Sequence, residues 1–248
     1  REATLGLAGD SWGSLVFGRQ QNVASRYIGD IASPFGDSLE LAAIGKTFTS
    51  AATVRADNTV VYATPNFNGF DFAVGYSFNV NGDQQWNIKN TGGANPKDQN
   101  AKLVTTGLRY VNGPIAVAAS YDNLKASAWG KSAQAWNLAG SYDFEVVKLH
   151  LAWGQERNGL LSSRGYNSDV NTAMGMGFSG YQKDYKTNNF AVGVSAPVGA
   201  AGKVMAGWAM SRVSDNDWFQ ANGDKKSQNL FSLGYTYNLS KRTNVYAV

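Results

Sequence analysis

The side chains that carry most enzyme chemistry are scarce in this sequence. The chain has no Cys and one His, His150, among 248 residues. These counts exclude a disulfide framework, a cysteine nucleophile and a zinc cluster, and they disfavour a His-based triad. No serine-nucleophile motif surrounds His150, and nothing singles out a catalytic pair of carboxylates. We therefore predict no catalytic residue, no metal site and no cofactor.

Charged side chains offer a different chemistry, namely an electric field that acts on ions. Six candidates lie in or beside one polar stretch, residues 21–54: Arg19, Asp30, Asp37, Glu40, Lys46 and Arg55. Charges that oppose each other across a narrow, wet gap order water and favour small polar solutes over apolar ones. The alternative is that they are ordinary solvated loop charges. The choice depends on the elements that hold this stretch.

Composition separates this chain from a typical soluble domain. Charged residues make up 16% of the chain, against roughly 25% in soluble domains. The content of glycine, 28 residues, and of aromatic residues, 12%, is high. No run of about 18 apolar residues could form a membrane-spanning helix. The net charge of +4 is spread along the chain without a Lys/Arg block, so nucleic acid is not an expected partner.

The dominant pattern is alternation with a period of two residues. From Phe70 to Asn79, large apolar residues occupy every second position, and small or polar residues occupy the positions between them. Successive side chains of a strand point to opposite faces, so this segment has one apolar and one polar face. The pattern recurs along the chain and predicts an all-β protein.

About twelve strands follow from this alternation. They are predicted near residues 2–9, 13–20, 55–64, 70–79, 101–111, 114–124, 133–143, 146–155, 187–196, 203–213, 228–238 and 243–248. Short turns alternate strictly with longer connections, so the short turns share one end of the sheet. This arrangement is typical of a transmembrane antiparallel β-barrel of the outer membrane. A soluble β-sandwich has no reason to sort its loops in this way.

In such a barrel the apolar face contacts lipid and the other face lines the lumen. The lumen positions are mostly small or polar, which favours a water-filled pore over a barrel filled with side chains. The predicted lumen charges are Arg109, Lys148, His150, Asp57, Asp71 and Asp122. Arg19 shares its parity with Leu15 and Phe17, so we expect either a β-bulge beside it or a position beyond the apolar band.

Aromatic residues mark the end of the predicted apolar band. Those that flank the short turns are Tyr62, Phe70, Tyr110, Tyr142, Phe144 and Tyr237. Amphipathic rings favour the headgroup level of a bilayer. We therefore predict an aromatic girdle on the turn side of the barrel.

Four stretches carry a family resemblance. They are REATLGLAGDSWGSLVFGRQ at the start, RYIGDIASPFGDS, TPNFNGFDFAVGY, and GYTYNLSKRTNVYAV at the end. Over nearly its whole length the chain resembles the general diffusion porins of the Gram-negative outer membrane, most of all the β-proteobacterial group. The resemblance implies a barrel of about sixteen strands that assembles as a homotrimer.

The resemblance also implies how the chain is organised. Residues 1–248 would form a single barrel domain that lacks its N- and C-terminal strands, with about three strands missing before Arg1. A closed barrel of twelve strands is the alternative. Residues 21–54 would fold inward as the constriction loop. In this arrangement Asp30, Asp37 and Glu40 form the acidic side of the constriction. Arg19 and Arg55, with Lys46 as a possible addition, form the basic side.

We therefore expect an outer-membrane channel for passive diffusion of ions and small hydrophilic solutes, weakly selective for anions. Its other partners would be outer-membrane lipid and lipopolysaccharide. A substrate-specific channel or a surface receptor on the same barrel is one alternative. The alternative from a different class is a soluble carbohydrate-binding β-sandwich that uses its Trp residues as stacking platforms.

Overall fold

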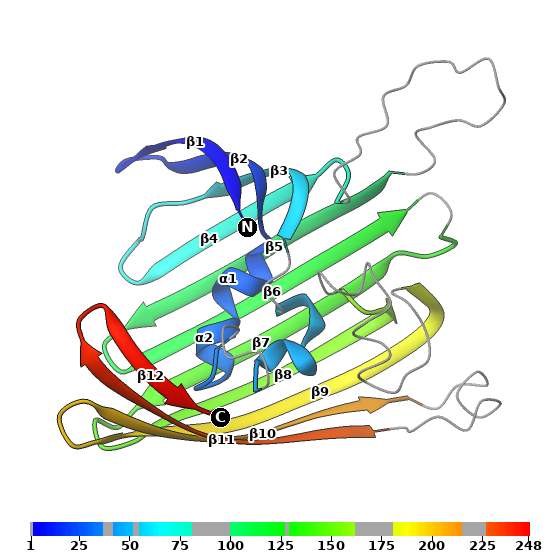
Figure 1. Cartoon of the computed structure of the whole chain (residues 1–248). Helices are drawn as coiled ribbons and strands as arrows, with labels where there is room; N and C mark the ends of the chain where they lie inside the picture. Colours follow the sequence, from blue (N-terminus) through cyan, green and yellow to red (C-terminus); the bar gives the residue numbers. More distant parts are fainter. Residues whose placement is uncertain are drawn as a thin grey trace, which may run out of the picture.

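Twelve antiparallel strands form a single sheet (Figure 1). The computed structural model describes residues 2–36, 42–51, 55–80, 100–126, 129–161, 181–214 and 227–248. The strands are β1 (Ala3–Gly9), β2 (Gly13–Gln21), β3 (Arg55–Ala63), β4 (Phe70–Ser77), β5 (Ala101–Asn112), β6 (Ile115–Ala126), β7 (Ala133–Asp143), β8 (Lys148–Gly159), β9 (Tyr181–Val198), β10 (Gly202–Val213), β11 (Ser227–Ser240) and β12 (Thr243–Ala247). The predicted all-β class and the strand number of twelve are confirmed.

Each strand pairs with its neighbours in sequence, so the order in the sheet runs from β1 to β12 without a crossover. This topology excludes the two packed sheets of a soluble β-sandwich. β1 and β12 are the two edges of the described sheet. The total of about sixteen strands in the barrel stays a prediction.

At the end of the sheet near the long connections, β8 and β9 extend further than the alternation predicted. β9 begins at Tyr181 rather than near residue 187, and β8 continues to Gly159. Their polar ends pair with each other, with Arg157 opposite Lys186 and Glu156 opposite Thr187. Hydrophobic alternation identifies only the part of a strand that has an apolar face, so these polar extensions were missed.

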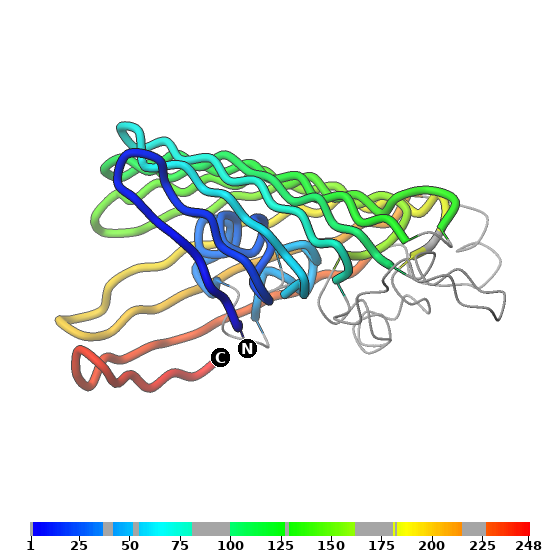
Figure 2. Tube along the Cα trace, turned by 90° about the horizontal axis from the view of Figure 1, so that it is seen from above, coloured from blue at the N-terminus to red at the C-terminus, as the bar shows by residue number. Residues whose placement is uncertain are grey.

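The sheet is strongly curved, and short helices lie in its hollow (Figure 2). They are α1 (Val23–Tyr27), α2 (Gly29–Ala32), η1 (Ile44–Lys46) and η2 (Thr49–Ala51). α1 contacts β4, β5 and β6, and α2 contacts β6 to β9. The described helices between β2 and β3 therefore lie against the concave face of the sheet. Among the described helices, none has the length and hydropathy needed to span a membrane.

The two faces of the sheet differ as the alternation predicted. On β7, Leu138 is 49% exposed on the convex face, whereas the neighbouring Asn137 and Ala139 are buried beneath the helices. Leu108, Leu151 and the other convex apolar residues repeat this pattern. Such an outward apolar band is unfavourable in water but matches the hydrocarbon of a bilayer.

Aromatic rings gather at the turn end of the convex face. Phe70 and Tyr110 lie on paired strands with ring centroids 4.3 Å apart. The ring centroids of Tyr142 and Phe144 are 4.5 Å apart. These pairs occupy the place predicted for the turn-side girdle. Their amphipathic rings suit the boundary between hydrocarbon and headgroups.

Replacement of Leu138 by Arg tests the assignment of the convex face. Leu138 lies midway along β7, so the variant is expected to lower the free energy of unfolding from lipid vesicles by about 2–4 kcal/mol. Gln134→Arg, on the same face near the strand end, should cost at most about 1 kcal/mol. Urea titrations of both variants in vesicles measure the difference, and equal costs would contradict a lipid-facing band.

Candidate functional site in the hollow of the sheet

The segment that follows β2 is a broken helix with one apolar and one polar face. Asn22 caps α1, since its Oδ1 accepts a hydrogen bond from the Ser25 amide at 3.2 Å. The buried residues of α1 and α2 recur at helical spacing: Val23, Tyr27, Ile28 and Ile31. Arg26 and Asp30, four residues apart, are exposed on the opposite side. The segment therefore turns its apolar face to the sheet.

Small residues on the concave wall receive this apolar face. A Cβ added to Gly107 would lie 2.8 Å from Val23 Cγ1, and one added to Gly154 would lie 2.9 Å from the Phe48 ring. Ala118, Ala139 and Ala191 belong to the same buried cluster. Side chains larger than these would displace the segment. The lumen-facing small residues therefore do not simply leave space for water, as predicted, because many of them seat the helices.

A buried carboxylate on β8 holds the returning limb of the segment. Glu156 is fully buried, and its Oε1 accepts hydrogen bonds from the Thr49 amide at 2.8 Å and the Thr49 hydroxyl at 2.7 Å. The Thr187 hydroxyl lies 3.4 Å from Oε2. Thr49 Oγ1 in turn accepts a hydrogen bond from the Leu161 amide at 2.8 Å. A buried polar group that lost these partners would be left unsatisfied, so Glu156 acts as an anchor.

A second buried carboxylate, on β6, holds the outgoing limb. Asn22 Nδ2 donates to Asp122 Oδ1 at 3.1 Å and to the Ser50 carbonyl at 2.8 Å. One strand away, Thr105 Oγ1 accepts a hydrogen bond from the Val23 amide at 2.8 Å. Asn22 thus ties the two limbs of the segment to each other and to the wall.

His150 on β8 contacts the end of α2. Its Nδ1 lies 3.0 Å from the Ile31 carbonyl oxygen, and because a carbonyl oxygen only accepts, Nδ1 is the donor of this hydrogen bond. The side chain is buried, as is that of Asp122. Both lie on the concave face as predicted. Neither side chain is exposed to the hollow, because the helices cover both.

Arg19 forms an ion pair beside the segment. Its Nη1 lies 2.6 Å from Asp57 Oδ2, and both side chains are partly exposed. The pairing of β2 with β3 shifts its register between Gly18 and Gln20, and Gly18 has a φ of +119°. The parity of Arg19 led us to expect either a β-bulge beside it or a position beyond the apolar band, and the register shift, whose extra residue lies on β3, agrees with an irregularity at this point. The charge of Asp57, a predicted lumen acid, is offset by Arg19.

Arg109, Asp71 and Tyr27 form a second charged cluster under α1. Arg109 Nη2 lies 3.0 Å from Asp71 Oδ2, and the Arg109 guanidinium lies 4.7 Å from the centroid of the Tyr27 ring. Burial, together with a hydrogen bond to Asp71, raises the pKa of the Tyr27 phenol well above its usual value. Tyr27 therefore stays neutral and covers the ion pair.

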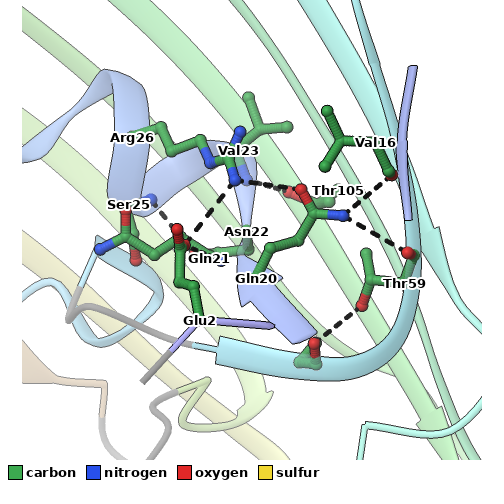
Figure 3. A network of polar contacts seen from close by, with 11 residues as sticks. Glu2, Val16, Gln20, Gln21, Asn22, Val23, Ser25, Arg26, Thr59 and Thr105 are labelled. Carbon is green, nitrogen blue, oxygen red and sulfur yellow. Dashed lines mark hydrogen bonds and ion pairs between the residues drawn. The ribbon is translucent and has the colours of Figure 1, made fainter. Parts of the chain in front are cut away.

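Arg26 joins the exposed side of α1 to the start of the sheet (Figure 3). Its Nη2 donates to Gln20 Oε1 at 3.0 Å and lies 3.7 Å from Glu2 Oε1. Gln20 is fully buried and donates to the carbonyls of Val16 and Thr59. Sequence reasoning missed Arg26, although its helical spacing from Asp30 was a usable signal.

The other predicted site residues are distributed around the hollow. Asp30 is exposed in the first turn of α2, Lys46 is half-buried at the end of η1, and Arg55 is half-buried at the start of β3. Lys148 is half-buried at the turn end of β8, where it lies opposite Asp143 in the register of β7 and β8. Asp37 and Glu40 lie outside the described residues. Among the residues that are described, no group of three or more His, Asp or Glu side chains could hold a metal ion.

A curved antiparallel sheet with an apolar convex face and a charged, helix-lined hollow is the architecture of a porin. A family model described as Gram-negative porin matches residues 1–248. The chain belongs to the Gram-negative porin family. The predicted family and its outer-membrane location are thereby confirmed.

Relatives and solved structures agree with this assignment. The porin is 46% identical over 258 residues to an outer membrane porin protein of Bordetella pertussis, and 31% identical over 195 residues to outer membrane porin protein 32 of Delftia acidovorans. The matches cover 100% and 78% of this chain, but only 65% and 45% of the two relatives. The chain therefore spans less than two thirds of their length.

Among solved structures, the fold is similar to that of an anion-selective porin from Comamonas acidovorans. The TM-score is 0.70 at 25% sequence identity, and the match covers 99% of this chain and 65% of that porin. A Salmonella typhi OmpF structure matches with a TM-score of 0.66 at 20% identity, over 98% of this chain and 68% of that one. The latter likeness supports the fold alone.

Thr49→Val tests the anchoring role of Glu156. The variant keeps the shape of the side chain but removes one hydrogen bond to a buried carboxylate and the acceptor of the Leu161 amide. Such losses cost about 1–3 kcal/mol each. Amide hydrogen exchange in Ile44–Ala51 is therefore expected to accelerate roughly tenfold or more.

Thr187→Val is the matched control, because the Thr187 hydroxyl reaches the same carboxylate only at 3.4 Å. Its effect on exchange in Ile44–Ala51 should be much smaller. Equal exchange rates in the two variants and the wild type would show that Glu156 does not hold the segment.

Proposed function

We propose that this porin forms a water-filled channel for passive diffusion of ions and small hydrophilic solutes across the outer membrane. The seated segment, residues 22–51, narrows this channel. The observation that carries the proposal is the packing of an inward helical segment on the concave face of a sheet whose convex face is apolar. The family is one of channels, and we propose no catalytic role for any residue.

We propose that the constriction is formed by the exposed face of this segment and the wall beside β2 and β3. Arg26 and Asp30 lie on the exposed face, and Arg19 and Arg55 lie on the adjoining strands. These side chains are the ones a solute in the hollow would meet. Asp37, Glu40 and Lys46 remain part of the proposed constriction.

Weak anion selectivity is part of the proposal. The carboxylates of Asp57 and Asp71 are ion-paired, and those of Asp122 and Glu156 are covered by the segment. The ion pairs engage Arg19 and Arg109 as well, so it is the covering of Asp122 and Glu156 that leaves exposed or half-exposed cations such as Lys46 with fewer competing acids than the sequence suggests. The sign in excess along a narrow pore biases ion passage. The similar Comamonas acidovorans porin is described as anion-selective.

The assembly and the surroundings also remain proposals. We infer a homotrimer embedded in outer-membrane lipid and lipopolysaccharide, as the family resemblance implies. The apolar convex face is the surface available for contact with lipid and with neighbouring subunits.

Planar bilayers test the channel and its selectivity together. The purified porin is expected to insert as open channels, with a reversal potential in a salt gradient of the sign that indicates anion preference. Absence of conductance would refute the channel, and clear cation preference would refute the proposed selectivity while leaving the channel standing.

Single charge changes test the proposed constriction. Arg19→Gln leaves Asp57 without its cation, so the anion-to-cation permeability ratio should fall by roughly twofold, and Arg55→Gln should act in the same direction. Asp30→Asn should raise the ratio. Lys241→Gln, an exposed change at a short turn, is the control and should leave it unaltered. Wild-type ratios in all three constriction variants would place these residues away from the narrowing.

A further inference from the structure

A buried amide lies where β2 meets the seated segment. Gln20, the last residue but one of β2, is fully buried. Its Nε2 donates to the carbonyl oxygen of Val16 at 3.0 Å and lies 3.3 Å from that of Thr59, which it also reaches as a donor. A primary amide has two N–H donors, and these carbonyls of β2 and β3 use both. The side-chain oxygen of Gln20 is thereby aimed away from both carbonyls, toward α1 (Figure 3).

The guanidinium of Arg26 meets this oxygen. Arg26 Nη2 donates to Gln20 Oε1 at 3.0 Å. The carbonyls of Val16 and Thr59 only accept hydrogen bonds, and a guanidinium only donates them. A single orientation of the Gln20 amide therefore satisfies all three partners. The backbone of the sheet, through Gln20, thus fixes the direction in which the Arg26 side chain leaves α1.

The partner that orients Arg26 carries no charge. Carboxylate oxygens lie 2.6 Å from Arg19 and 3.0 Å from Arg109, so these two arginines are held by ion pairs. The nearest carboxylate to Arg26 is that of Glu2, whose Oε1 lies 3.7 Å from Nη2 and already accepts the Gln21 amide at 2.8 Å. The side chains of Arg26 and Glu2 are 33% and 40% exposed, so water screens this pair. The hydrogen bond to the amide orients the guanidinium without neutralising it.

The position of this cation depends on the same hydrogen bond. Without the Gln20 oxygen, the guanidinium is within reach of two acids, Glu2 and, four residues further along the segment, Asp30. A close ion pair with either acid would remove its charge from the field in the hollow. Gln20 therefore competes with these acids for Arg26.

We propose that Gln20 is a positioning residue for Arg26, and that Arg26, held in this way, is a specificity-determining cation of the pore. The inference rests on the proposed function, in which the seated segment narrows the channel. Arg26 belongs to the segment itself, whereas Arg19 and Arg55 belong to the wall beside it. Anions in transit thus meet positive charge on both sides of the narrowing. A fixed charge close to a narrow pore biases which ions pass.

A double-mutant cycle tests whether Gln20 acts through Arg26. Gln20→Met keeps the length of the side chain but removes the amide, so the anion-to-cation permeability ratio should fall by roughly twofold, as it should in Arg26→Gln. The variant with both changes should have the ratio of Arg26→Gln alone, because Gln20 has no further partner through which to act on ions. Gln134→Met, on the convex face, is the matched control and should keep the wild-type ratio. Equal reductions by Gln20→Met in the presence and absence of Arg26 would overturn the positioning role.

Nitrogen NMR of the guanidinium tests the positioning without any ion flow and without a variant at Gln20. The Arg26 signals are assigned by their loss in Arg26→Gln. In the wild-type porin, hindered rotation should give separate Nη1 and Nη2 signals, and in Gln20→Met these should merge. Merged signals in the wild type would overturn the inference, and so would a wild-type permeability ratio in Arg26→Gln. Both results leave the proposed channel standing, whereas a wild-type porin that does not conduct, or that prefers cations, refutes the proposed function.

Discussion

The seating of a short helical segment on a wall of small residues is the constraint on which the rest of this structure depends. Gly107 and Gly154 let Val23 and Phe48 approach the backbone of the sheet, and no larger side chain would leave that space. Burial of apolar area provides a non-directional attraction. The hydrogen bonds to Asp122 and Glu156 add direction, because they fix where each limb of the segment meets the wall.

This arrangement also decides which charges face the hollow. Covering Asp122 and Glu156 removes two carboxylates from the lumen surface, and the pairs Arg19–Asp57 and Arg109–Asp71 neutralise two more. Acidic groups are thus used to hold the segment and to orient arginines. Each pair neutralises an arginine as well, so the proposed anion preference follows from the covering of Asp122 and Glu156 rather than from the small net charge of the chain.

Much of the fold could be predicted from sequence, because the two-residue period is a local signal. Alternation identified twelve strands and assigned Leu138 and His150 to opposite faces. It could not show what covers a face, so His150 and Asp122 were expected in open water. It also missed Arg26 and Glu156. The exposure of Arg26 depends on the five-residue helix α1 inside a stretch interpreted as loop, and the role of Glu156 depends on Thr49, which lies 107 residues away.

The register shift near Gly18 could be anticipated from the sequence, but its consequence for Arg19 could not. The parity of Arg19 predicted either a bulge beside it or a position beyond the apolar band, and the register of β2 and β3 shifts at this point. The partner of Arg19 could not be derived, because pairing across the bulge depends on the return of the chain after the seated segment. Residues 81–99, 162–180 and 215–226 of the long connections, together with Asp37 and Glu40, lie outside the described residues.

The most direct measurement of the central claim is the single-channel conductance of a porin whose residues 23–51 are replaced by a short Gly-Ser linker. If the seated segment narrows the pore, this variant will conduct more than the wild type and will admit larger sugars in liposome-swelling assays. An unchanged conductance and size limit in a correctly inserted variant would contradict the account.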